Sequence, residues 1–108
     1  MENLIKKLAN MNGRVYVYLD DADIGNAFMK QAEEEGFKFK DGVLPTERPY
    51  SEVMAVNSDN TINYVGTNGM IVFGIRAKRI GTKKLIRVDY KKYAAGEKNY
   101  LYRKRMNG

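Results

Sequence analysis

The sequence predicts an α+β fold, in which a single antiparallel or mixed sheet carries one main helix on a face, with a short helix at the N-terminus. Three observations predict this class. The length of 108 residues suits a single domain, 1–108, with one core. Apolar residues recur at helical spacing early in the chain, over 4–11 and 21–35. Most later segments alternate apolar and polar residues between short turns, as strands do.

The first three elements follow from spacing and capping signals. Residues 4–11 place their leucines and isoleucine on one face, and an Asn-Gly pair ends this short helix. Residues 14–19 place two valines and a leucine on one face and Tyr16 and Tyr18 on the other, which predicts a strand. The helix over 21–35 opens with aspartates, which cap free backbone N–H groups, and stops at a glycine.

A hairpin is the clearest prediction in the middle of the chain. Its strands are the β-rich runs 52–56 and 61–65, which an Asn-Ser-Asp-Asn turn separates. Before it, residues 37–40 alternate and predict a short strand. Residues 43–51 contain two prolines, which disfavour both helix and central strand, so an extended loop is expected there.

The second half of the chain reads mostly as strands. Residues 66–69, Gly-Thr-Asn-Gly, predict a β-turn. Residues 70–75 are apolar on both faces; their β-branched content favours a buried strand, and a helix running to residue 79 is the alternative. Alternation predicts strands over 84–90 and 99–105. Strands joined by short turns should pair antiparallel, leaving the sheet face opposite the main helix partly open.

Charge is divided unevenly along the chain. Of the net charge of +6, residues 1–65 contribute −4, from seven basic and eleven acidic side chains, and residues 66–108 contribute +10, from twelve basic and two acidic. The cations are either a solvated edge that blocks sheet association or a face for phosphates or an acidic protein. The candidate residues for binding an anionic partner are Arg76, Lys78, Arg79, Lys83, Lys84, Arg103, Lys104 and Arg105.

Tyrosine is frequent, and five tyrosines, including Tyr90, lie on predicted strands with cations nearby in sequence. Aromatic side chains on an open sheet stack bases, and they also anchor protein interfaces. The simpler interpretation is that they pack across strands. The candidate aromatic contacts are Tyr16, Tyr18, Tyr100 and Tyr102.

The composition excludes several chemistries. Cys, His and Trp are absent, which removes thiol and imidazole catalysis, disulfides and the usual zinc sites. The cluster of Asp20, Asp21 and Asp23 at a strand-to-helix junction reads as helix capping, with Mg²⁺ binding as the alternative. The glycines at 66–69 lack the Gly-Lys-Ser/Thr ending of a phosphate loop. We therefore expect no cofactor, no metal site and no catalytic residue.

Four segments carry a resemblance: Arg-Val-Tyr-Val-Tyr-Leu at 14–19, Ala-Glu-Glu-Glu-Gly-Phe-Lys-Phe at 32–39, Asp-Asn-Thr-Ile-Asn-Tyr-Val-Gly at 59–66 and Leu-Ile-Arg-Val-Asp-Tyr at 85–90. They resemble small uncharacterised proteins encoded by phages and mobile elements of Gram-positive bacteria, over most of residues 14–105. The segments are structural pieces rather than catalytic motifs. The resemblance therefore implies a genomic setting and, by analogy alone, a binding function, without assigning a functional residue.

These observations predict a small non-enzymatic binding module that engages a protein partner, with nucleic-acid binding through the basic C-terminal half as the alternative. A metal-dependent or small-molecule enzyme centred on Asp20 and Asp23 is a third hypothesis. The N-terminus lacks the apolar run of a signal peptide, and no apolar stretch approaches the length of about 20 residues that spans a bilayer. We therefore expect a cytoplasmic protein without a membrane partner.

Overall fold

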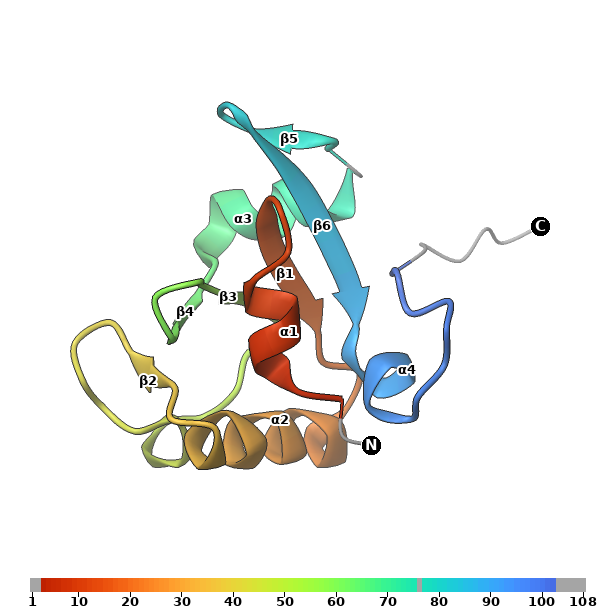
Figure 1. Ribbon diagram of the computed structural model, residues 1–108. Coiled ribbons are helices and arrows are strands. Elements are labelled where there is room, and N and C mark those ends of the chain that lie inside the picture. The colour runs from red at the N-terminus through yellow and green to blue at the C-terminus, as the bar shows by residue number, and fades with distance from the viewer. Residues whose placement is uncertain (1–2, 76, 103–108) are drawn as a thin grey trace.

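A mixed β-sheet forms the centre of the protein (Figure 1). The computed structural model describes residues 3–75 and 77–102. Over these residues the sheet has six strands in the order β2-β4-β3-β1-β6-β5, which confirms the α+β class. The elements are α1 (Ile5–Ala9), β1 (Arg14–Tyr18), α2 (Ala22–Glu34), β2 (Lys38–Phe39), η1 (Pro45–Glu47), β3 (Val53–Val56), β4 (Thr61–Tyr64), α3 (Gly66–Gly74), β5 (Arg79–Ile80), β6 (Lys83–Asp89) and α4 (Tyr90–Ala94).

The central strand β1 has one neighbour of each orientation. It pairs antiparallel with β3, where Val17 is matched with Met54, and parallel with β6, where Val17 is matched with Val88. A parallel pair needs a long crossover connection, and the chain from α2 to β5 supplies it. The consecutive pairs β3–β4 and β5–β6 are antiparallel, as predicted. The sheet is mixed because its central pair joins the two halves of the chain.

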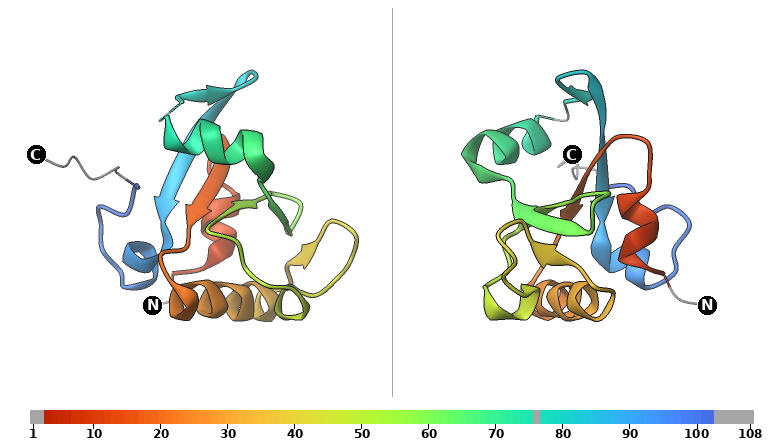
Figure 2. Two further views of the ribbon diagram at one scale, coloured as in Figure 1. Left: turned by 180° about the vertical axis from the view of Figure 1, so that it is seen from behind. Right: turned by 60° about the vertical axis from the view of Figure 1, so that its left-hand side comes forward.

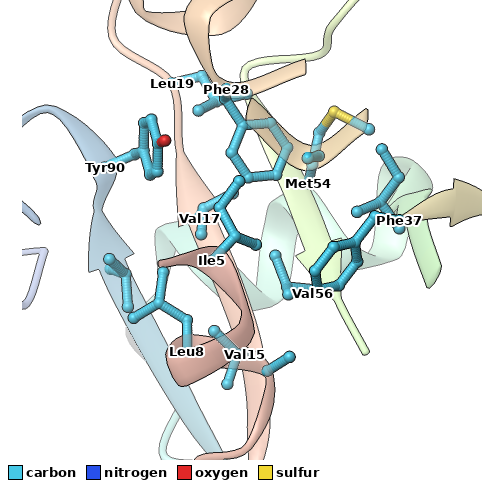
Figure 3. Packing of buried hydrophobic residues seen from close by; sticks show 14 of the residues in the cluster. Ile5, Leu8, Val15, Val17, Leu19, Phe28, Phe37, Met54, Val56 and Tyr90 are labelled. Carbon is cyan, nitrogen blue, oxygen red and sulfur yellow. The ribbon is translucent and has the colours of Figure 1, made fainter. Parts of the chain in front are cut away.

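Helices α1, α2 and α4 bury one face of this sheet. Alternation along β1 directs Val15 and Val17 to this face, where they join Ile5 of α1 and Phe28 of α2 in one buried cluster (Figure 3). The ring of Phe28 meets the ring of Tyr90 edge to face, with centroids 5.1 Å apart. The short α1 and α4, marginal as isolated helices, are held by this packing.

The main helix α2 has the ends that the sequence predicts. The carboxylate of Asp21 accepts a hydrogen bond from the N–H of Ile24 at 3.0 Å, which confirms the capping interpretation for that residue. Gly36 follows the helix with a φ of +90°, and Phe37 after it is fully buried. Within the described residues no helix is both long and apolar enough to cross a membrane.

The hairpin also follows the prediction. Strands β3 and β4 pair antiparallel across the expected turn, and Asn60 in that turn has a φ of +66°. The expected short strand is β2, which pairs parallel with β4 at the edge of the sheet. The proline-containing loop departs from the expected extended form at the 3-10 turn η1.

The opposite face of the sheet is covered by α3, which corrects two predictions (Figure 2, left). Residues 66–69 are the first turn of this helix rather than a β-turn, and residues 70–75 are helical rather than a strand. The expected alternative helix exists but ends at Gly74. Phe73 is buried in one cluster with Tyr16 on this face of the sheet, which shows why the prediction from local β-preference is wrong: packing on the sheet outweighs the propensity of the β-branched residues.

A second correction concerns the end of the strand predicted over 84–90. Strand β6 stops at Asp89, and Tyr90 begins helix α4. The alternation of apolar and polar residues continues through Tyr90, so it gives no sign of this boundary. The Asp89 carboxylate accepts a hydrogen bond from the N–H of Lys92 at 3.4 Å and so caps α4. Tyr90 and Tyr93, three residues apart, are then both buried on one side of the helix.

The last strand, predicted over 99–105, is much shorter in the structure. Leu101 forms an isolated antiparallel bridge with Val88, and the N–H of Tyr102 donates to the carbonyl of Arg87 at 2.9 Å. Residues 103–105 lie outside the described residues. The described part of this segment thus covers the outer edge of β6 without forming a regular strand.

Candidate functional site

A polar groove of about 660 Å³ opens at the end of the sheet where β1 and β6 begin. It is lined by the α1–β1 loop, the β3–β4 turn and the β5–β6 hairpin, whose tip extends beyond the other elements (Figure 1). We call it the basic groove, because its lining contains the cations Arg14, Lys40, Arg79, Lys83 and Lys84.

The β5–β6 hairpin supplies three of the five cations. Arg79 is paired with Lys84 across the hairpin, and Ile80 with Lys83. Gly81 at the tip has a φ of +59°, which an L-residue rarely adopts and which allows the tight reversal. The guanidinium of Arg79 donates to the carbonyl of Thr82 at 2.6 Å and is thereby held at the tip. The hairpin therefore presents its charges from a short, defined scaffold.

The α1–β1 loop forms the floor by touching β6 directly. A Cβ added at Gly13 would lie 2.5 Å from the carbonyl oxygen of Lys84, so only glycine allows this approach. Arg14 follows at once, and its guanidinium donates to the side-chain oxygen of Asn57 in the β3–β4 turn at 3.1 Å. This hydrogen bond ties the turn to the start of β1 and fixes one cation of the groove.

One carboxylate, that of Asp59, lines the groove beside the five cations. The hydroxyl of Thr61 donates to it and, as the largest effect, lowers the pKa of Asp59 below its ordinary value; the positive charge of Lys40 adds to this. Asp59 is therefore charged at neutral pH. Over the described residues, neither recorded ion pair involves a groove cation, so the lining carries a clear excess of positive charge.

The structure brings together three of the eight predicted basic residues in the basic groove, namely Arg79, Lys83 and Lys84. Lys78 does not line this groove, but it lines a neighbouring depression together with Arg79 and Lys84. The remaining four, Arg76, Arg103, Lys104 and Arg105, lie outside the described residues.

Sequence reasoning missed two cations of the groove, Arg14 and Lys40, because both belong to the acidic half of the chain. Charge counting along the sequence carried no signal for them. Arg14 reaches the basic hairpin only through the parallel pairing of β1 with β6, in which it is matched with Leu85. Lys40 reaches it through the pairing of β2 with β4 at the other side of the sheet.

No family model, curated protein or solved structure matches this chain.

The four candidate tyrosines do not form one surface. Tyr16 is 6% exposed and lies beneath α3, so its ring is not accessible. Tyr18 and Tyr102 pack on each other, with centroids 4.7 Å apart. Tyr100 packs instead on Tyr93, at 5.0 Å. Partial burial is the main cause that raises the pKa of Tyr18 above its ordinary value, and the Asp20 carboxylate adds to it.

Two of the three aspartates at the start of α2 have contacts that serve local structure. Asp21 caps the helix, and Asp20 accepts from the hydroxyl of Tyr18 at 3.3 Å and lies 4.0 Å from the ammonium of Lys91. Within the described residues, no three acidic side chains are grouped as metal ligands would be. These contacts give the cluster a structural role at the junction of β1 and α2.

One further surface feature is apolar. Ile71 and Ile75 are 55% and 69% exposed, although Phe73 between them is buried against the sheet. Residues four apart lie on the same side of a helix, so the two isoleucines share the outer side of the α3 segment. Exposed apolar side chains gathered on one surface are typical of protein contact sites.

Proposed function

We propose that the protein is a small binding module that holds the phosphate backbone of a nucleic acid in the basic groove. The observation that carries this proposal is the convergence of five cations from three separate segments, with one carboxylate among them. Nucleic-acid binding was the alternative expectation from the sequence, and we prefer it here to a protein partner. The reason is that the chain gathers charge from both halves into one concave site.

The chemistry of the lining suits phosphates. Lysine presents a compact charge on a flexible stem, and the arginine guanidinium presents parallel N–H donors that match two phosphate oxygens. Asn12 and Ser58, both exposed on the groove, add neutral polar groups that hydrogen-bond to a sugar-phosphate chain. If each of the five cations neutralises one phosphate, log K falls with log salt at a slope of about −4 to −5.

The first test measures binding of labelled mixed-sequence oligonucleotides by fluorescence anisotropy at several salt concentrations. Replacing Lys83 and Lys84 together by alanine removes two phosphate contacts, which reduces the slope by about 2 and the affinity on the order of a hundredfold at about 50 mM salt. The matched control replaces Lys30 and Lys98, which are equally exposed and lie away from the groove, by alanine. We expect that control to bind nearly as the wild type does.

A gain of binding provides the second test, because misfolding does not produce one. Asp59→Asn removes the negative charge from the groove while keeping a side chain that accepts from Thr61. We expect tighter binding and a steeper salt dependence. Absence of binding by the wild type at micromolar protein and about 50 mM salt would overturn the proposal. So would equal losses in the groove variant and its control.

A second candidate function, contact with a protein partner, is favoured by the exposed Ile71 and Ile75 of the α3 segment. Replacing both by serine leaves nucleic-acid binding unchanged if the basic groove is the site of that binding. A partner that is retained by the wild type and by the Lys30 and Lys98 control, but lost from the serine variant, would support this second function.

A further inference from the structure

We infer that the nucleic acid is double-stranded DNA, with one phosphate backbone in the basic groove and the β5–β6 hairpin inserted in the major groove of the duplex. This inference rests on the proposed function and names its ligand. Three features of the described residues carry it: the absence of aromatic side chains from the basic groove, the projection of the hairpin, and the position of charge along it.

The described lining of the basic groove offers no aromatic ring on which an unstacked base could stack. None of the described residues that form it is aromatic. Proteins that bind single strands combine a positive channel with aromatic rings on which successive bases stack. A purely cationic groove instead matches a continuous phosphate backbone whose bases remain paired and stacked.

Aromatic side chains on the sheet outside the basic groove are already engaged. Phe73, Tyr18 and Tyr102 pack on one another, with centroids 4.7 to 6.2 Å apart. Tyr64, which is 40% exposed, donates its hydroxyl to the carbonyl of Pro49 at 2.6 Å, and its ring lies 5.3 Å from that of Phe39. These contacts would have to break before such rings could receive bases.

The β5–β6 hairpin has the form that enters a duplex. It is a two-stranded ribbon, it ends in a tight turn, and it extends beyond the helices and the other strands in every view (Figures 1 and 2). The major groove of B-form DNA, about 12 Å wide, accepts a two-stranded ribbon. The deep, narrow major groove of duplex RNA does not admit side chains in this way. The geometry therefore favours DNA over RNA.

Charge lies where such an insertion needs it. Lys83 and Lys84 stand at the base of the tip, with Arg79 opposite, and all three line the basic groove, so the inserted ribbon would hold cations against a phosphate backbone. Arg14 and Lys40 lie on the other side of the basic groove. One backbone would then be held between the hairpin and the body of the protein, while Thr82 at the tip reaches the base edges.

The experiment compares three ligands of one sequence and length: duplex DNA, single-stranded DNA and duplex RNA. With five neutralised phosphates, the lower charge density of a single strand alone weakens binding on the order of tenfold at about 50 mM salt. We expect duplex DNA to bind tightest of the three. Equal or tighter binding of single-stranded DNA or duplex RNA would overturn this inference and leave the proposed function standing. Failure of all three ligands to bind would overturn both.

A second measurement locates the hairpin in the complex. The chain has no cysteine, so Thr82→Cys introduces a single thiol at the tip, and Glu97→Cys introduces a matched one in the loop after α4. Saturating duplex DNA should slow alkylation of the thiol at 82 several-fold and leave the thiol at 97 unchanged. Alkylation at 82 that proceeds at the same rate in the presence of bound duplex would contradict insertion of the hairpin.

Discussion

Replacing Gly25 by alanine tests how the proline-containing loop is fastened to the main helix. Gly25 lies in α2 and is buried, with the ring of Tyr50 resting on it. A Cβ added at this position would lie 2.6 Å from Cδ1 of Tyr50 and closer still to Cγ and Cδ2. Since Gly25 is not among the residues with positive φ, alanine fits the backbone, and only the tyrosine ring opposes it.

Two effects of opposite sign determine the magnitude. Alanine in a helix interior is favoured over glycine by about 1 kcal/mol. Overpacking costs about 1 to 3 kcal/mol, and the upper end applies here because the contact includes Cγ, which rotation of the ring does not move. The half-buried ring must leave its place against the core. We therefore expect a net loss of about 1 to 2 kcal/mol, which corresponds to a decrease in Tm of about 5 to 15 °C.

The assay is urea unfolding followed by far-ultraviolet circular dichroism, on a double-mutant cycle of Gly25→Ala and Tyr50→Ala. In the Tyr50→Ala background the clash is gone, so Gly25→Ala should raise the free energy of unfolding by about 1 kcal/mol. Gly25→Ala should therefore destabilise the protein when Tyr50 is present and stabilise it when Tyr50 is replaced by alanine. If Gly25→Ala stabilises the protein with Tyr50 in place, or if the two changes are additive, the packing argument is refuted.

Three further predictions concern the N-terminal helix, the groove floor and alkaline pH. Glu35→Ala removes the carboxylate that accepts from the N–H groups of Ile5 and Lys6, each at 2.8 Å, and should cost about 1 to 3 kcal/mol and speed hydrogen exchange in α1. Gly13→Ala forces the loop away from the Lys84 carbonyl, and should weaken oligonucleotide binding in anisotropy along with stability in urea. Burial is the main cause that raises the pKa of Tyr90 above its ordinary 10.0, and the negative charge of Glu35 adds a smaller effect in the same direction. The folded chain therefore keeps this proton while the unfolded chain loses it, so urea titrations should show stability falling above about pH 10, less steeply in Tyr90→Phe.

Elements with their own boundary signals could be predicted from the sequence. Helix α2 has an aspartate cap and a glycine stop, and the β3–β4 hairpin has its turn residues, so neighbouring residues alone specify both. The faces of β1 followed from alternation, with Val17 in the main core and Tyr16 on the other side. In these segments local preference and tertiary packing agree.

Elements decided by distant contacts could not be predicted in this way. Residues 70–75 are apolar on both faces, a pattern shared by a buried strand and a covered helix, and packing of Phe73 on the sheet selects the helix. At the end of β6, Asp89 continues the alternation and also caps α4, so the change of structure is hidden. The groove itself was not predicted, and only its hairpin cations were named as candidates, because Arg14 and Lys40 approach them through strand pairing rather than through neighbouring sequence.

The parallel pairing of β1 with β6 also sets the order of events during synthesis. Arg14 is matched with Leu85 and Tyr18 with Asp89, so the ribosome must extend the chain through β6 before the central pair can close. Contacts this distant in sequence form slowly, and the strand edges stay unpaired and exposed until they do. Nascent chains that end before β6 would have neither the central strand pair nor a complete basic groove, so the proposed nucleic-acid binding would require synthesis through β6.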